Sequence, residues 1–204
     1  MEGGCQDPVY NTWQILYMRK YFFQKLNIDI DVKPPPSISS SSQIHLISKS
    51  KKPIMMVMKR SVGSKFTRNG FDSVRQWTED FTMKLISNLK IEFPTYELLL
   101  YSDQNTTVMN CLECQIRLMS ETSVLIGMHG AGLGHQIYMP TNSAVMEIAP
   151  YQNDARCLLG GGPFSRASVL LGHDYAMHHP VMDEYVWKHR AAEFNITRFS
   201  QHLK

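Results

Sequence analysis

The chain has 204 residues, and 43% of them are apolar, which is enough to form the core of one large domain, or of one domain with an appendage, and excludes disorder for most of the chain. Lysine and arginine total 21 against 18 aspartates and glutamates, and this net charge of +3 permits a local anion site but not the broad basic surface of a nucleic-acid-binding protein. No apolar run approaches the roughly 18 residues that cross a bilayer, and the first residues lack the basic and apolar regions of a signal peptide. We therefore expect no nucleic-acid partner, no membrane span and no targeting segment in this chain.

The first part of the chain predicts a helix followed by a linker. Residues 13–26 carry apolar side chains at three- and four-residue spacings, which predicts a well-buried amphipathic helix. Three prolines and a serine-rich run over residues 34–43 cannot propagate a helix or pack a core, so they predict a linker or surface loop. The expected organisation is a helix and linker over 1–43, a domain over 44–180 and a tail without clear periodicity over 181–204.

Beyond the linker, apolar runs alternate with segments of helical periodicity. The expected strands are 53–59, 96–102, 123–128, 144–150 and 174–178, and the expected helices are 71–89, 107–120 and 164–171. The strands are continuous apolar runs rather than alternating ones, which is typical of a parallel sheet covered by helices on both faces. The pattern therefore predicts an α/β domain with a doubly wound, Rossmann-like sheet.

The cysteines do not indicate a metal site. Cys111 and Cys114 fall on the expected helix 107–120, and no second close pair completes a tetrahedral zinc site. We interpret them as small buried side chains on one helical face. Cys5 and Cys157 stand alone, and a disulfide that involves Cys157 stays open.

The most informative segment is GMHGAGLGHQIYMP, residues 127–140, which directly follows an apolar strand and opens into a helix. In an open parallel sheet, ligands bind at the carboxyl ends of the strands, and a glycine-rich turn lets backbone N–H groups approach an anion. Gly130, Ala131 and Gly132 form a turn almost without side chains, and His129 at the strand end can donate to the same anion. The turn predicts a phosphate or diphosphate site, and the alternative is a tight turn beside a partly buried histidine.

Rival motifs fit this segment less well. The dinucleotide pattern GxGxxG requires a glycine where His135 stands, which weakens a nicotinamide-dependent oxidoreductase, and the Walker pattern is absent. No GxSxG elbow exists in the chain, so a serine hydrolase has no nucleophile. Glu147, near the end of the next strand, could accept hydrogen bonds from sugar or ribose hydroxyls, or could simply be a solvated carboxylate.

The strings VLIGMHGAGLGHQIYMP and AVMEI resemble the signature of glycosyltransferase family 61, especially its branch of EGF-domain-specific O-linked N-acetylglucosamine transferases. The resemblance extends more weakly upstream, to the basic strand end at Arg60 and to Arg68 and Asn69. It covers residues 15–175, and it is specific only over residues 123–150.

The resemblance implies the carboxyl-terminal half of a GT-B enzyme that inverts the anomeric carbon without a metal ion or any cofactor other than its donor. The donor would be a UDP-sugar, with N-acetylglucosamine as the expected sugar, and the acceptor a protein or glycan hydroxyl. In the family an amino-terminal domain, expected to be missing from this chain, supplies much of the acceptor site. The family also implies the lumen of the endoplasmic reticulum or Golgi. The alternative is a catalytically incomplete nucleotide-binding module.

Charge grows on the departing UDP in such a transfer, and cations or N–H donors stabilise it. His129 and Arg60 are the catalytic candidates, because both stand at the carboxyl edge of the expected sheet. The donor-binding candidates are Gly130, Ala131, Gly132, Leu133, His135, Glu147, Arg68 and Asn69.

Overall fold

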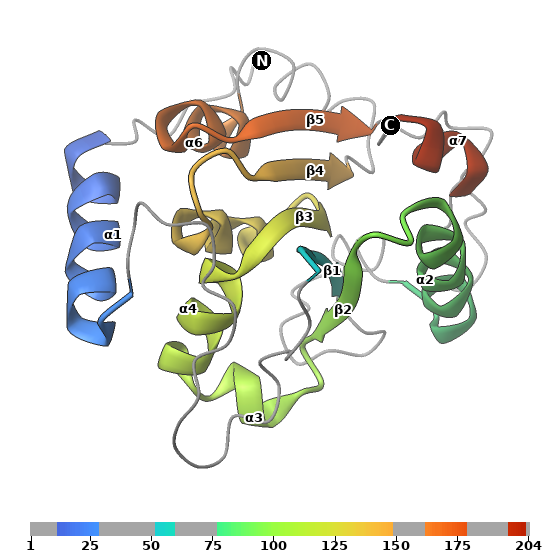
Figure 1. Cartoon of the computed structure of the whole chain (residues 1–204), viewed down its shortest axis with the longest axis horizontal. Helices are drawn as coiled ribbons and strands as arrows, with labels where there is room; N and C mark the ends of the chain where they lie inside the picture. The colour runs from blue at the N-terminus through green and yellow to red at the C-terminus, as the bar shows by residue number, and fades with distance from the viewer. Residues whose placement is uncertain (1–11, 29–51, 60–76, 149–161, 179–195, 203–204) are drawn as a thin grey trace, which may run out of the picture.

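One parallel sheet organises the molecule. The computed structural model describes residues 12–28, 52–59, 77–148, 162–178 and 196–202 (Figure 1). Its five strands pair in parallel in the order β2-β1-β3-β4-β5. They are β1 (Ile54–Lys59), β2 (Glu97–Ser102), β3 (Thr122–Met128), β4 (Ala144–Ile148) and β5 (Asp174–His178). All five expected strands are confirmed, with ends that differ by a residue or two, and residues 149–150 lie outside the described part.

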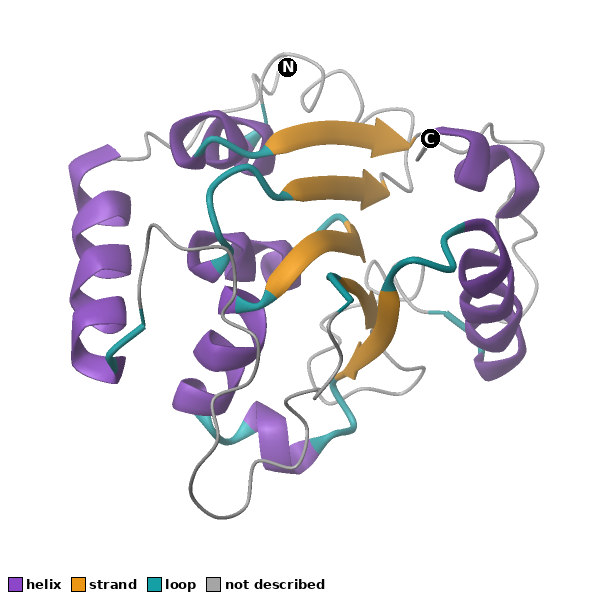
Figure 2. Ribbon diagram, viewed as in Figure 1, coloured by secondary structure: helices purple, strands orange, loops and turns teal. Residues whose placement is uncertain are grey.

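Helices cover both faces of this sheet, which confirms the doubly wound α/β class (Figure 2). α2 and α7 pack against one face, and α1, α3, α4 and η2 contribute to the core on the other. The helical segments are α1 (Thr12–Leu26), α2 (Glu79–Glu92), α3 (Thr106–Met109), α4 (Leu112–Ser120), η2 (Ala131–Tyr138), α6 (Pro163–Leu171) and α7 (Ile196–His202). None of these helices, in the part of the chain that is described, is long and apolar enough to cross a membrane.

The two cores follow from the alternation of side chains along each strand. Met55 and Val57 face α2 and α7, whereas Met56 and Met58 face α4 and η2. Every side chain of β1 is buried. This explains why the strand reads as a continuous apolar run, since the central strands of a parallel sheet are covered on both sides.

α2 begins later than the expected helix over residues 71–89. Trp77 forms a bridge rather than a helical turn, and Thr78 is the N-cap, with its hydroxyl oxygen accepting the N–H of Phe81 at 3.1 Å. The expectation is therefore wrong at Trp77 and Thr78, and the earlier residues of that segment lie outside the described part. The cap overrides the periodicity because it satisfies a backbone donor that the first helical turn leaves unpaired.

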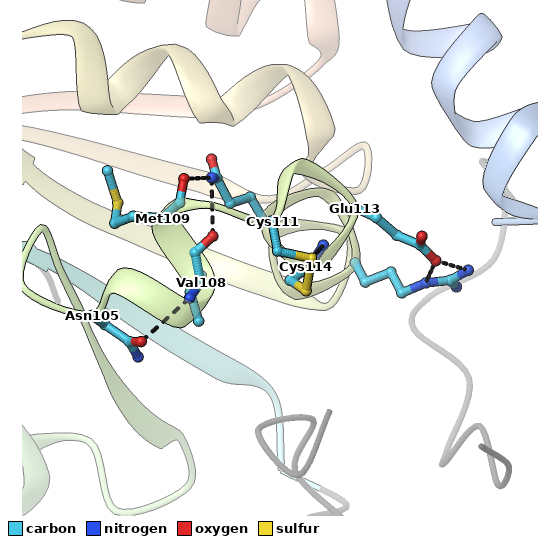
Figure 3. Close-up of a disulfide and its surroundings, with 8 residues drawn as sticks. Asn105, Val108, Met109, Cys111, Glu113 and Cys114 are labelled. Atoms are coloured by element: carbon cyan, nitrogen blue, oxygen red, sulfur yellow. Dashed lines mark hydrogen bonds and ion pairs between the residues drawn. A yellow bond between two sulfur atoms is a disulfide. The ribbon is translucent and has the colours of Figure 1, made fainter. Parts of the chain in front are cut away.

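The expected helix over residues 107–120 is in fact two helices. Asn105 caps α3 by accepting the N–H of Val108 at 3.3 Å, and Cys111 is the extended N-cap residue of α4 (Figure 3). Cys111 and Cys114 form a disulfide, so the interpretation of them as small buried side chains on one helix was wrong. The CxxC spacing fits this cross-link because one residue caps the helix that carries the other.

The terminal helices differ from expectation in opposite ways. α1 was predicted to be well buried, but Tyr17 is 70% exposed, and α1 is anchored through the buried side chains of Phe23 and Arg19. The guanidinium of Arg19 donates to the carbonyl of Met139 at 2.8 Å. Phe199 of α7, within the segment expected as a tail, is fully buried against the sheet. The expected linker over 34–43 lies outside the described residues.

The disulfide predicts a measurable contribution to stability. Replacing both Cys111 and Cys114 by serine should lower the free energy of unfolding by about 2 kcal/mol, because the unfolded chain regains the entropy of a short loop. Serine at position 111 keeps an oxygen that can cap α4, so the difference reports the cross-link rather than the cap. Urea unfolding of the two proteins without reductant measures it, and equal midpoints with equal slopes would contradict the prediction.

Candidate functional site

The strand order creates a crevice at the carboxyl end of the sheet. From β1 the chain moves to β2 on one side, and from β2 it crosses to β3 on the other side of β1. The strand order therefore reverses between β1 and β3, and open α/β sheets bind ligands at such a switch point. A cavity of about 380 Å³ lies here, and its lining includes Met58, Lys59, Tyr101 and residues 128–133.

The glycine-rich turn forms one wall of this cavity. Gly130 has φ 154° and ψ 177°, a conformation that is essentially restricted to glycine. A Cβ on Gly127 would lie 3.0 Å from Leu133 Cδ2, so this glycine lets Leu133 pack directly on β3. Gly132 lies beside the thioether of Met58, where a Cβ would be at 3.5 Å from the sulfur. The backbone of the turn is thereby exposed to the cavity with little side-chain cover.

From Ala131 onward the turn is part of a 3₁₀-helix, η2, which is hydrogen-bonded to its neighbours. The Ser168 hydroxyl donates to Gln136 Oε1 at 2.6 Å, and Gln136 Nε2 donates to the carbonyl of Phe164 at 3.3 Å. Both bonds link η2 to α6. Since Gln136 is fully buried, these bonds also satisfy a polar group that would otherwise be costly to bury.

His135 lines the cavity with a ring whose nitrogens are already engaged. Nδ1 lies 2.9 Å from the carbonyl of Gly132, and Nε2 lies 2.8 Å from Gln115 Oε1. Gln115 Nε2 donates to the carbonyls of Val108 and Met109 at 3.1 and 2.9 Å, which fixes the amide so that its oxygen faces His135. Burial lowers the pKa of His135, although the Gly132 carbonyl opposes the shift. A ligand contact through either nitrogen would break one of these contacts.

Glu147 is completely buried on the same face of the sheet as η2. Oε1 is hydrogen-bonded to His129 Nδ1, and Oε2 accepts the hydroxyl of Tyr175 at 2.5 Å. Burial raises the pKa of Tyr175, and the hydrogen bond to Glu147 raises it further. The hydroxyl of Tyr175 therefore stays protonated and donates to Glu147. The carboxylate is therefore not solvated at the strand end, and neither oxygen is exposed for a sugar hydroxyl.

His129 connects this buried carboxylate to the cavity. Its backbone N–H donates to the carbonyl of Ile148 at 2.9 Å, and the ring meets Phe164 with centroids 5.4 Å apart. The side chain is 18% exposed and lines the cavity. Among the described residues, none is hydrogen-bonded to Nε2, so this is the ring nitrogen that a ligand can reach.

Three residues escaped the sequence analysis. Lys59 is buried at the end of β1, forms an ion pair with Glu79 and lines the cavity, so it adds a cation there. Tyr101, at the end of β2, is 7% exposed, and burial raises its pKa to about 12. Tyr175 bonds to Glu147. The strand-end rule that selected Arg60 could have found Lys59 and Tyr101, whereas nothing local marks Tyr175.

The structure brings together part of the predicted site. Residues 129–133 and His135 line one cavity, and Glu147 lies behind His129. Arg60, Arg68 and Asn69 lie outside the described residues, so their proposed contacts stay predictions.

Comparison with known proteins gives consistent results. A family profile described as Glycosyltransferase 61 matches residues 6–146, which is more than half of the chain. The EGF domain-specific O-linked N-acetylglucosamine transferase of Rattus norvegicus is 33% identical over 79 residues, covering 35% of this chain and 15% of the rat protein. The protein of the same name from Canis lupus familiaris is 29% identical over 111 residues, covering 50% of this chain and 19% of the dog protein. The matched part of this chain thus spans less than a fifth of either relative.

The conformation of the turn predicts a contrast between two glycines. Gly130→Ala should lower the free energy of unfolding by about 1–3 kcal/mol, because alanine is strained in this conformation. Gly134→Ala is the control, since a Cβ at Gly134 would meet nothing within 4 Å. Urea unfolding of both variants measures the difference, and equal stabilities would show that Gly130 has ordinary backbone geometry.

Tyr101, which lines the cavity, and Tyr175, which bonds to the buried Glu147, should respond in opposite ways to removal of the hydroxyl. Among the described residues, the Tyr101 hydroxyl has no hydrogen-bond partner, so Tyr101→Phe should leave stability unchanged or raise it by up to about 1 kcal/mol. Tyr175→Phe should cost about 1–3 kcal/mol, because it leaves a buried carboxylate oxygen unpaired. Thermal or urea unfolding measures the stability of the two variants. A larger loss of stability for Tyr101→Phe than for Tyr175→Phe would contradict the prediction.

Proposed function

Because this chain belongs to glycosyltransferase family 61, we propose that it is the donor-binding part of a transferase that moves a sugar from UDP to a protein or glycan hydroxyl, with inversion and without a metal ion. The observation that carries the proposal is the position of the glycine-rich turn. Its backbone, His129 and Lys59 all line the cavity at the switch point of the sheet. Anionic ligands bind at such turns because N–H groups and nearby cations meet there.

The wall of the cavity that the glycine-rich turn forms is suited to bind the diphosphate of the donor. The turn has no bulky side chain to keep an anion away from the backbone, since residues 130–132 are glycine, alanine and glycine. Lys59, whose ammonium group is paired with Glu79, lines the cavity at the end of β1, as do Asp103 and the partly exposed ring of His129. A cation and a hydrogen-bond donor in a cavity with several apolar walls act more strongly than they would in bulk water.

In the proposed reaction, the acceptor oxygen attacks the anomeric carbon as the bond from that carbon to the β-phosphate oxygen breaks. The acceptor loses its proton to a base, and the electron pair of the broken bond stays on UDP. His129, when protonated, donates through Nε2 to the oxygen that gains this charge, and one such donor is typically worth about 3 kcal/mol in catalysis. We assign the base and the acceptor site to the amino-terminal domain that the family implies.

Two further parts of the proposal rest on separate observations. The names of the two relatives, both N-acetylglucosamine transferases, support N-acetylglucosamine as the transferred sugar. The Cys111–Cys114 disulfide supports the lumen of the endoplasmic reticulum or Golgi, because disulfides persist in oxidising compartments. A domain that binds UDP but transfers no sugar is the second candidate, because the proposal assigns the base to none of the described residues.

Calorimetric titration with UDP, UDP-N-acetylglucosamine, UDP-xylose and NAD, first without metal and then with manganese, tests the proposal. We expect metal-independent binding of UDP and of UDP-N-acetylglucosamine, with no binding of NAD. A folded chain that binds none of the uridine ligands would overturn the proposal. Binding of UDP by this chain, without transfer to any acceptor peptide when the amino-terminal domain of a family member is joined to it, would instead support the second candidate.

A substitution in the turn locates the ligand. Gly132→Val should weaken UDP binding at least about tenfold, because the added methyl groups fill space beside Met58 where the diphosphate is placed. Gly134→Ala is the control and should bind UDP as the wild type does, since nothing lies within 4 Å of its Cβ position. Unchanged UDP affinity in Gly132→Val would remove the turn from the site.

A further inference from the structure

We propose that Glu147 and Tyr175 are positioning residues, which hold the His129 ring with its proton on Nδ1 and its Nε2 directed into the cavity. The inference rests on the proposed function only in naming the donor diphosphate as the group that meets Nε2. Neither residue touches the ligand in this scheme. Each acts through the next, from Tyr175 to Glu147 to His129.

The register of three adjacent strands places these side chains in a diagonal row. Glu147 pairs with Gly127 of β3, which comes two residues before His129, so Glu147 lies two residues behind His129 along the strand direction. Tyr175 pairs with Val145 of β4, which comes two residues before Glu147, so Tyr175 lies two residues behind Glu147 along the strand direction. A shift of two keeps all three on the same face of the sheet, because side chains alternate with a period of two. Gly127 lies on this face two residues before His129, and Leu133 packs against it.

The hydrogen bonds assign the protons along the row. Tyr175 is protonated, so it donates to Glu147 Oε2 and holds that oxygen. The other oxygen faces His129 Nδ1, and an ionised carboxylate can only accept. When Glu147 is ionised, Nδ1 therefore carries a proton, and Nε2 faces the ligand, to which it donates once the ring has taken up a second proton.

The row of Tyr175, Glu147 and His129 ends at the cavity. This position indicates that the row orients His129 and does more than provide hydrogen bonds for a buried carboxylate. Glu147 has a side-chain exposure of 1%, whereas His129 reaches 18% and lines the cavity. A carboxylate kept only for stability needs no exposed partner, and burying an ion pair is a weak source of stability. Carboxylates that orient a working histidine in this manner set its tautomer and the direction of its ring.

Nuclear magnetic resonance of ¹⁵N-labelled histidine rings tests the assignment directly in this chain. We expect the His129 ring of the wild type to carry its slowly exchanging proton on Nδ1, and Tyr175→Phe to yield a mixture of tautomers. Tyr101→Phe is the control, because Tyr101 stands on the same cavity wall without a bond to Glu147. A wild-type ring protonated mainly on Nε2 would overturn the inference.

A double-mutant cycle on UDP affinity separates positioning from a general loss of packing. Tyr175→Phe should weaken UDP binding about 3- to 10-fold in the wild type and have no further effect in His129→Ala. Glu147→Gln provides a second variant of the same size, in which an NH₂ donor replaces one of the two oxygens that face His129 and Tyr175. Equal effects of Tyr175→Phe with and without His129 would overturn the inference. A wild-type chain that shows the Nδ1 proton but binds no UDP would refute the proposed function while supporting the positioning.

Discussion

Burial of the parallel sheet on both faces is the constraint on which the rest of this structure depends. Met56 of β1 and Leu125 of β3 have no exposed surface, so polar side chains have almost no place along the central strands. The polar side chains of the candidate site lie instead at the carboxyl ends of the strands, where the turns begin. Lys59, Tyr101 and His129 meet there in one cavity because their strands are adjacent and parallel.

Glu147 is the exception to this arrangement, and its partners explain how it is tolerated. An ionised carboxylate without partners is among the most expensive groups to bury. His129 and Tyr175 each bond one oxygen, so the negative charge is shared with two donors from neighbouring segments. The sheet is thereby connected to the cavity by a polar row rather than by apolar packing alone.

The glycine-rich turn is held in place although it has few side chains of its own. η2 is tied to α6 through Gln136, to α4 through the contact of His135 with Gln115, and to α1 through the bond from Arg19 to Met139 just after η2. These bonds come from three helices on the same side of the sheet. A turn fixed in this way already has its final conformation before an anion binds. Such preorganisation is the main source of electrostatic stabilisation in enzymes.

The strands, the doubly wound class, the turn with His129 and the family can all be predicted from the sequence, because continuous apolar runs and the spacing of HGAGL are local features. The sequence also placed Glu147 near that turn. The starts of α2 and α4 depend on the Thr78 cap and on the Cys111–Cys114 cross-link, which join residues three apart and which helical periodicity does not reveal. The bond from Tyr175 to Glu147 depends on the register of β4 against β5. Register is set by packing between segments far apart in the chain, so no local pattern could reveal it.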